Sequence, residues 1–327
     1  MLSSAQTDIL NKALPAGQQV GLGDQIRMAQ GLYGKAFFLD CVNGNDSYDG
    51  SSPEKAFKTI AVAYAALTEN KNEVLYVMGG ATSIQVTAAF TWAKSYTHMV
   101  GVSAGGPYGR SRFGHTGTGH VVTLFTITAN GCIFKNIHWQ MGNGHAENLN
   151  CVLLSATTNY CYFENCHFDA PLDATEGAAA YCCLYMTALS RSNSFKGCWF
   201  GDWTAAPSST DGTLVNFLGT NAGTQFEDCV FLINTTQATM VAVTAAVDIG
   251  GGNAPGYLWF RNCDFIAGAT GVNAAFTAPT TGKIVISKCR GFGVAEWCAD
   301  ASANVMIACG PAEEANGQGG IGVAQGS

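Results

Sequence analysis

The sequence is poor in charge. Lys, Arg, Asp and Glu make up only 12% of its 327 residues, and 16 basic against 23 acidic residues leave a formal net charge of −7. The basic residues form no cluster that could neutralise a run of phosphates, which excludes nucleic acid as a partner. No stretch approaches the ~20 apolar residues of a membrane span, and Asp8 interrupts the start where a signal peptide needs an apolar core. We therefore expect a soluble protein made in a cytoplasm, without a membrane partner.

Cysteine is abundant, with 13 residues, but none of the patterns that give cysteine a chemical task is present. The count is odd, the chain is long and no signal peptide is found, which argues against a disulfide framework. No CxxC pair accompanies a histidine cluster, so zinc is not supported. We expect free, buried thiols that pack as small apolar side chains, with no metal and no cofactor.

A six-residue motif returns along the chain, which is the signature of stacked structural repeats. Its copies are FKNIHW (134–139), FENCHF (163–168), FKGCWF (195–200), FEDCVF (226–231), FRNCDF (260–265) and ISKCRG (286–291). The fourth positions of successive copies are 29, 32, 31, 34 and 26 residues apart. The period is therefore elastic, as loops of variable length would make it.

A second short apolar run precedes the motif, for example VLLSA at 152–156 and LYMTA at 184–188. Short runs of this kind, bounded by Gly, Asn or Thr, are typical of strands. The 40 glycines and 47% apolar residues also favour many short strands joined by tight turns. Two or three strands per repeat predict an all-β fold, a parallel β-solenoid of stacked coils.

Each column of the aligned motif has its own residue type. We expect the two aromatics and the cysteine to point inward as a structural ladder, which includes Phe163, Cys166, Cys198, Cys229, Cys263 and Cys289. The third column is mostly Asn, Gly or Asp, residues that tolerate the left-handed backbone of a sharp corner. The second column alternates in charge from Lys135 to Arg261, which would pair each charge with its opposite on the next coil.

The start of the repeats is expected to carry a lid. Ser52 as N-cap and Pro53 at the first helical position predict a capping helix over 53–68, with Phe57 and Ile60 on its apolar face. Such a lid would cover strand edges that otherwise invite stacking by another chain. The domain organisation is then an N-terminal arm (1–35), the β-helix (36–310) and a Gly-rich tail (311–327).

This region resembles the N-terminal signature of pectate-lyase-like right-handed β-helix proteins, V-N-G-x-D-x-x-D-G-x-S-P-x-x-A-F-K-T-I. The matching residues are Val42, Asn43, Gly44, Asp46, Asp49, Gly50, Ser52, Pro53, Ala56, Phe57, Lys58, Thr59 and Ile60. The resemblance implies a right-handed parallel β-helix. It leaves activity open, because this architecture hosts lyases, hydrolases and inert structural proteins.

A finer resemblance is carried by the order of LPAGQQVGLGD (14–24), the cap signature, NEVLYV (72–77), FTWAKSYTHMVGV (90–102) and GCIFKN (131–136). In this order the sequence is similar to β-helix proteins encoded beside tailed-phage head genes. The resemblance implies a virion component such as a capsid decoration protein, and it favours a homotrimer.

Candidate partner-binding residues fall in two places. The arm offers two short amphipathic segments, and the outward column of the repeats holds large aromatics that neighbouring loops or subunits would cover. These residues are Leu10, Leu14, Val20, Ile26, Tyr162, Trp199, Trp203 and Trp259.

Catalytic and metal sites receive less support. β-Helix hydrolases need two or three carboxylates on adjacent coils, and the loop acids that could supply them are Asp169, Asp173, Glu176, Asp202 and Asp211. Loop acids are usually solvated surface. The turn 43–50 partly mimics a calcium loop but has Ala56 where the last ligand should be Glu. His138 and His167 share a column and are expected to stack at the surface, without a third ligand. His115 and His120 lie in a Gly-rich loop that a partner would order.

The sequence therefore predicts a non-enzymatic phage structural protein, a capsid decoration or reinforcement protein of the virion, assembled in the host cytoplasm. Its expected partners are its own copies, as a homotrimer, and the major capsid protein or another virion protein. The alternative is a tailspike-like module that binds or cleaves host polysaccharide, with a surface glycan as its partner.

Overall fold

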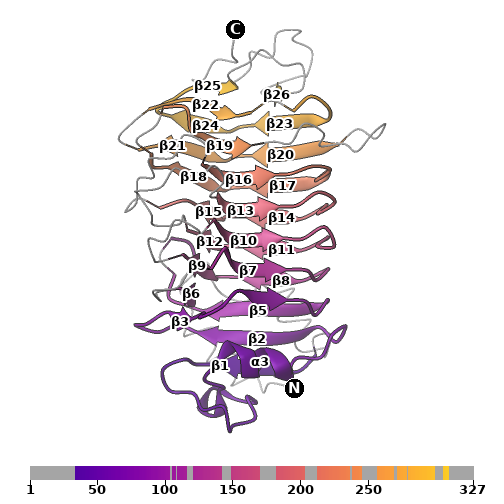
Figure 1. Ribbon diagram of the computed structural model, residues 1–327, viewed down its shortest axis with the longest axis vertical. Helices are drawn as coiled ribbons and strands as arrows, with labels where there is room; N and C mark the ends of the chain where they lie inside the picture. Colours follow the sequence, from indigo (N-terminus) through magenta and orange to yellow (C-terminus); the bar gives the residue numbers. More distant parts are fainter. Residues whose placement is uncertain are drawn as a thin grey trace.

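The chain winds into a rod of stacked coils (Figure 1). A computed structural model describes residues 34–103, 105–107, 109–115, 121–141, 149–169, 182–202, 212–235, 238–244, 256–268, 271–277, 279–298 and 305–308. Within these residues the strands form three sheets, here called A, B and C, and every strand pairing is parallel. A typical coil passes from sheet C to sheet A to sheet B, as β7, β8 and β9 do. Among the described residues no helix is long and apolar enough to cross a membrane.

The strands follow one another in each sheet in the order in which the coils stack. Sheet A contains β1 (Ala36–Leu39), β2 (Glu73–Met78), β5 (Thr97–Val102), β8 (Ile133–Lys135), β11 (Tyr162–Glu164), β14 (Ser194–Lys196), β17 (Thr224–Glu227), β20 (Tyr257–Arg261), β23 (Lys283–Ser287) and β26 (Val305–Ala308). Sheet B contains β3 (Ile84–Gln85), β6 (Arg112–Gly114), β9 (His138–Gln140), β12 (His167–Phe168), β15 (Trp199–Phe200), β18 (Val230–Ile233), β21 (Asp264–Ala267) and β24 (Arg290–Phe292). Sheet C contains β4 (Phe90–Trp92), β7 (Thr123–Ile127), β10 (Asn150–Leu154), β13 (Cys182–Met186), β16 (Thr213–Phe217), β19 (Val241–Thr244), β22 (Val272–Phe276) and β25 (Val294–Cys298).

Two columns of aromatic rings fill the core. In sheet A, rings of successive coils lie 4.7–5.0 Å apart and almost parallel, from Phe134 through Phe163, Phe195 and Phe226 to Phe260. In sheet B a second column runs through Trp139, Phe168, Phe200, Phe231 and Phe265, with centroids 4.5–5.1 Å apart. All ten side chains are buried. Offset stacking of this kind adds about 0.5–1.5 kcal/mol per pair beyond area burial, so the columns are a main source of stability.

The cysteines of the motif stack beside the first aromatic column. Their thiols donate weak hydrogen bonds of 3.4–3.6 Å to phenylalanine carbonyls of the preceding coil, through Cys166, Cys198, Cys229, Cys263 and Cys289. Burial raises the pKa of the Cys198 and Cys229 thiols well above the usual range, so they stay protonated. Every cysteine that the structure describes is a free thiol, and all but Cys41 are buried. These cysteines pack as small apolar groups that also satisfy a carbonyl.

The corner between sheets A and B is a single left-handed residue in each coil. The φ angles of this column lie between 52° and 60° at Asn136, Asn165, Gly197, Asp228, Asn262 and Lys288. The sequence predicts this bend because Asn, Asp and Gly tolerate positive φ. Lys288 is the exception, and it stands on the last of these coils.

The N-terminal lid differs from the expected continuous helix over 53–68. It consists of a 3-10 turn, η1 (Pro53–Lys55), and a separate helix, α3 (Ile60–Ala66). Between them Asp46 accepts hydrogen bonds from the backbone N–H groups of Lys58 and Thr59, while Phe57 pairs with β1 as an isolated parallel bridge. The chain at 56–59 is thus held extended, so Phe57 packs from a bridge and not from a helix face.

The lid is fastened to the first full coil by the side chains of Lys94 and Tyr64. Lys94 Nζ donates to the carbonyls of Tyr64, Ala65 and Leu67 at the end of α3, where helix carbonyls lack partners. The Tyr64 hydroxyl in turn accepts from the backbone N–H groups of Ala93 and Lys94. The charged Lys94 side chain and these backbone hydrogen bonds therefore hold the lid on the N-terminal end of the rod.

Removing one ring from the core column should be costly. We expect Phe226→Ala to lower the free energy of unfolding by about 3–5 kcal/mol, because it leaves a cavity between Phe195 and Phe260. Gln225→Ala, the exposed neighbour on the same strand, is the matched control and should change it by less than about 0.5 kcal/mol. Urea unfolding followed by circular dichroism measures both, and equal losses would contradict the ladder.

The strained corner residue offers the opposite test. Lys288→Gly should raise the free energy of unfolding by about 0.5–1 kcal/mol, because glycine adopts φ 55° without steric strain. Ser287→Gly, one residue earlier in strand β23, should lower it by a similar amount. Thermal midpoints of the two variants should shift in opposite directions, and a shared direction would refute the assignment of strain to residue 288.

Candidate functional site

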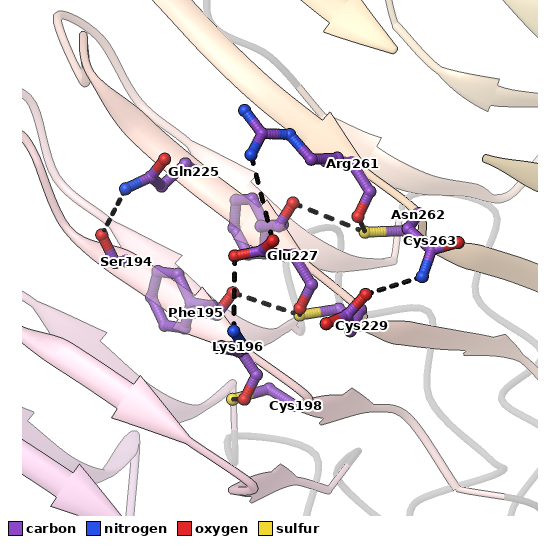
Figure 2. A network of polar contacts seen from close by, with 12 residues as sticks. Ser194, Phe195, Lys196, Cys198, Gln225, Glu227, Cys229, Arg261, Asn262 and Cys263 are labelled. Atoms are coloured by element: carbon purple, nitrogen blue, oxygen red, sulfur yellow. Dashed lines mark hydrogen bonds and ion pairs between the residues drawn. The ribbon is translucent and has the colours of Figure 1, made fainter. Parts of the chain in front are cut away.

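The outer face of sheet A carries a column of paired charges (Figure 2). Lys135 Nζ lies 3.1 Å from Glu164 Oε2. Two coils further along the rod, Lys196 Nζ lies 3.8 Å from Glu227 Oε2, the pair drawn in Figure 2. Arg261 Nη1 approaches the other oxygen of Glu227 at 3.9 Å. Such partly exposed pairs contribute roughly 0.2–1 kcal/mol each. Their chemical consequence is that the two outward acids of this column are each held by a base.

Aromatic residues stand beside this charged column. Trp259 is exposed on β20, with the Arg261 guanidinium 5.3 Å from its ring centroid. On the neighbouring β17, Gln225 donates from Nε2 to Ser194 Oγ at 2.9 Å (Figure 2). Tyr162 lies in the same column as Trp259 but is half-buried, and burial followed by the nearby Glu164 raises its pKa well above the usual range. The outer face of sheet A therefore carries one exposed indole ring beside amide, hydroxyl and guanidinium groups.

The predicted partner residues do not form one patch. Tyr162 and Trp259 share the outer face of sheet A, whereas Trp199 begins β15 in sheet B. Trp199 is half-buried and lies beside the segment 105–107 that follows β5. This segment is anchored by the Gly106 N–H, which donates to the Asn165 carbonyl. Trp203 and the arm residues Leu10, Leu14, Val20 and Ile26 lie outside the described residues.

The histidine column is buried, which corrects the expectation of a surface stack. His138 and His167 do stack, with ring centroids 4.3 Å apart and planes 18° apart, but both side chains are inaccessible. His138 Nδ1 lies 3.4 Å from the Gly109 carbonyl, and His167 Nε2 lies 2.8 Å from the Gly201 carbonyl. The segment around Gly109, which follows β5, covers the histidine column. The repeat does not predict the path of this segment.

Two of the five loop acids belong to this buried cluster and not to solvated surface. Asp169 and Asp202 are buried, and Asp169 Oδ2 lies 3.2 Å from His138 Nε2. Asp173, Glu176 and Asp211 lie outside the described residues. Burial and the nearby Arg112 lower the pKa of His138 to about 4, and burial also lowers the pKa of His167. At neutral pH the stacked imidazoles are therefore uncharged parts of a packed network.

Buried thiols complete this cluster; buried cysteines were expected from the sequence, but not their position beside a buried acid. Cys151 on β10 and Cys183 on β13 have pKa values raised well above normal, first by burial and then by neighbours that include Asp169. Their positions on consecutive coils follow from the register of β10 and β13, in which Val152 pairs with Leu184. The two cysteines occupy equivalent positions in consecutive repeats, and the sequence shows this spacing. The spacing does not indicate that acids lie nearby.

His115 is also buried within its own chain, so no partner is needed to order it. Its Nδ1 lies 2.7 Å from the Val86 carbonyl. His120 lies outside the described residues. His98 has a structural task as well, because its Nδ1 accepts the backbone N–H of Ile133 at 3.1 Å. Burial lowers the pKa of His98 to about 4, consistent with a neutral acceptor nitrogen.

The turn 43–50 is held by its own hydrogen bonds. Asn45 Oδ1 accepts from the Ser47 N–H and hydroxyl, and Asp49 Oδ1 accepts from the N–H and hydroxyl of Ser51. Gly50 has φ 68°, and a Cβ there would lie 2.1 Å from the Phe57 ring. The side-chain oxygens that resembled calcium ligands therefore accept hydrogen bonds within the turn. Among the described residues no group of three or more His, Cys, Asp or Glu could hold a metal ion.

Comparisons with known proteins address the fold. No protein-family model matches the sequence, and no curated protein matches it. Among solved structures the chain is similar to the pectate lyase Pel9A, with a TM-score of 0.56 and 13% identity, over 84% of this chain and 68% of that one. It is also similar to a deglycosylated pectin methylesterase from Aspergillus niger, with a TM-score of 0.50 and 11% identity, over 84% of this chain and 83% of that one. The predicted fold is confirmed: the chain is a pectate-lyase-like, right-handed parallel β-helix.

The neutral buried histidines predict a loss of stability in mild acid. The folded pKa of His98 is about 4, against an ordinary 6.5, so the unfolded chain takes up a proton first as the pH falls. The contribution of His98 to the free energy of unfolding should therefore be retained above about pH 6.5 and fall by about 2 kcal/mol by pH 5.

The measurement is urea unfolding at pH 7.5 and pH 5 for the wild type and for His98→Asn, whose amide oxygen can accept the Ile133 N–H without titrating. The variant should show a smaller difference between the two pH values, by about 2 kcal/mol. An unchanged difference would show that His98 is protonated equally in the folded and unfolded states.

Proposed function

We propose that this chain is a non-enzymatic structural protein that docks as a rigid rod on a larger assembly, and that this assembly is the head of a tailed phage. The observation that carries the structural role is the engagement of its reactive groups within the fold. Glu164 and Glu227 are paired with bases, and His138, His167 and Asp169 are buried against one another. General acid–base chemistry needs such groups within reach of a substrate.

The continuous core supports a load-carrying rod. One cluster of buried side chains extends from Leu39 on β1 to Val305 on β26. Because each coil contacts its neighbours through backbone hydrogen bonds and stacked rings, bending the rod would break many contacts together. A protein that reinforces or decorates a particle needs this property more than it needs a cleft.

The phage assignment is supported by the sequence resemblance to β-helix proteins encoded beside head genes. In this proposal the arm (1–35), with Leu10, Leu14, Val20 and Ile26, docks on the major capsid protein, and the outer face around Trp259 makes further contacts. Many copies on one particle would multiply a modest affinity for each copy.

Binding to particles tests this role. Full-length chain added to heads that lack it should bind with a fixed number of copies per capsomer, and a variant without residues 1–33 should bind at least about tenfold more weakly. Cosedimentation with quantitative gel analysis gives both values. Failure of the full-length chain to bind heads, or binding without saturation, would contradict the proposal.

Polysaccharide recognition is the second candidate, and the exposed Trp259 favours it. An indole beside Arg261 and Gln225 offers an apolar face and hydrogen-bonding groups to a sugar ring. Two of the structures to which the chain is similar are a pectate lyase and a pectin methylesterase. Incubation with host surface glycan separates the candidates: release of shorter chains would establish an enzyme, whereas binding that Trp259→Ala abolishes would establish a glycan-binding module.

A further inference from the structure

Two cysteines outside the ladder form a pair of their own at the C–A edge, where the chain passes from sheet C into sheet A. Cys132 directly precedes β8 and Cys161 directly precedes β11, and both are buried. The pairing of Ile133 with Tyr162 places the two cysteines at equivalent positions of successive coils. Neighbouring strands put equivalent Cα atoms about 4.8 Å apart, within the roughly 4.4–6.8 Å that a disulfide spans. The pair therefore has the backbone spacing of a disulfide.

The two thiols point in the same direction. Cys132 Sγ donates to the Lys94 carbonyl at 3.6 Å, and Cys161 Sγ donates to the Ala129 carbonyl at 3.4 Å. Both acceptors belong to the preceding coil, so the two side chains lie one above the other. The Cys161 thiol is within hydrogen-bonding reach of the Cys132 sulfur. Formation of an S–S bond therefore needs rotation of the side chains and no change of register.

The pair lies one residue beneath the surface. Gly131 and Tyr160, which directly precede the two cysteines, have φ 62° and 58° and form a second left-handed corner. Tyr160 is 70% exposed. A Cβ on Gly131 would lie 2.5 Å from the ring of Tyr96, which is exposed as well. A small reagent therefore has to pass only this turn to reach the two sulfurs.

Hydrogen-bond donors surround the Cys132 sulfur. The backbone N–H groups of Tyr96 and Thr97 and the indole N–H of Trp92 lie within reach of it. The Trp92 indole nitrogen is buried and forms no hydrogen bond with any described residue. A thiol sulfur is a weak acceptor, whereas a thiolate is charged and a much stronger one. These donors therefore favour loss of the Cys132 proton.

This environment sets Cys132 apart from the ladder. The hydrogen bond from the Cys161 thiol lowers the pKa of Cys132 most, and the other donors add to this against the opposing effect of burial. The pKa of Cys161 is raised, first by the same contact and then by burial. Burial raises the pKa of the ladder thiols Cys198 and Cys229. Of these four thiols Cys132 therefore has the largest share of thiolate, which is the form that oxidants attack.

From this geometry we infer that Cys132 and Cys161 are a modification site, at which a hydroperoxide oxidises the two thiols to a disulfide that joins successive coils. In the first step the Cys132 sulfur attacks one peroxide oxygen. An S–O bond forms as the O–O bond breaks, and the leaving hydroxide takes up the thiol proton as water. In the second step the Cys161 sulfur attacks the Cys132 sulfur, and the displaced hydroxyl leaves as water with the Cys161 proton. Two thiols thus lose two electrons and hydrogen peroxide gains them.

The inference does not depend on the phage role, because it concerns only the reactivity of the folded chain. The matched comparison lies within the same molecule. Trp199 pairs with Val230, so Cys198 and Cys229 are also equivalent residues of successive coils. They have the spacing of the proposed pair but raised pKa values.

Mapping of the oxidised thiols tests the inference. Reduced, folded full-length chain is treated with hydrogen peroxide, the remaining thiols are blocked with a maleimide, and unreduced peptides are identified by mass spectrometry. The Cys132–Cys161 link should form at least about tenfold faster than a link between Cys198 and Cys229. Equal rates would overturn the inference, and so would absence of the Cys132–Cys161 link once the more accessible Cys41 has reacted.

Single variants assign the steps to the two cysteines. In Cys161→Ser oxidation should stop at a sulfenic acid on Cys132, which dimedone traps. In Cys132→Ser residue 161 should stay a thiol. Trp92→Phe removes the indole N–H but keeps a ring, and should slow the link at least about twofold, whereas Trp297→Phe, at another buried indole without a hydrogen bond, should not. Trapping at residue 161 and not at 132, or equal slowing in both Phe variants, would contradict the inference.

Discussion

The parallel, in-register pairing of successive coils is the constraint on which the rest of the structure depends. It puts each side chain about 4.8 Å above its equivalent on the previous coil, so every column must hold residues that tolerate their own kind as neighbours. Aromatic rings meet this condition by stacking, and thiols meet it by donating to the carbonyl beside them, as Cys229 does to Phe195. Charges meet it only by alternating in sign, as Lys196 and Glu227 do. A shift of one residue in one coil would break all of these columns at once.

This constraint also explains why residue types that often act in catalysis are structural here. Burial lowers the pKa of both His138 and His167, because a charged imidazole would lose its hydration; Arg112 lowers the pKa of His138 further, and His138 lowers that of His167. Cysteines in a column are protonated for the related reason that burial disfavours the thiolate. The same packing that makes the rod stable therefore withdraws these histidines and ladder thiols from its surface.

The repeat was readable from the sequence because its causes are local. A six-residue motif holds two strands and the bend between them, so the inward aromatics and the left-handed corner could be predicted position by position. The buried histidines could not be predicted, because the segment that crosses them, around Gly109, belongs to another coil and no column records its path. The lid was misjudged for a similar reason: Asp46 reaches across to Lys58 and Thr59 and splits the expected helix. The repeat therefore predicts the contacts between equivalent positions of neighbouring coils. It does not predict the contacts that a non-repeating segment makes.

The two left-handed corners of a coil differ in the side chains that they carry. At the A–B corner the bend is a single residue directly followed by the buried cysteine, so a bulky side chain there would disturb the ladder, and Asn, Asp or Gly prevails. At the C–A edge the turn is several residues long, and the column of Tyr96 and Tyr160 stands at its outer side. A change at either corner reaches a buried cysteine through the backbone, because Cys161 directly follows Tyr160 and Cys166 directly follows Asn165. The exposed tyrosines at this edge are therefore large side chains on a left-handed backbone that lies as close to the core as the A–B corner does.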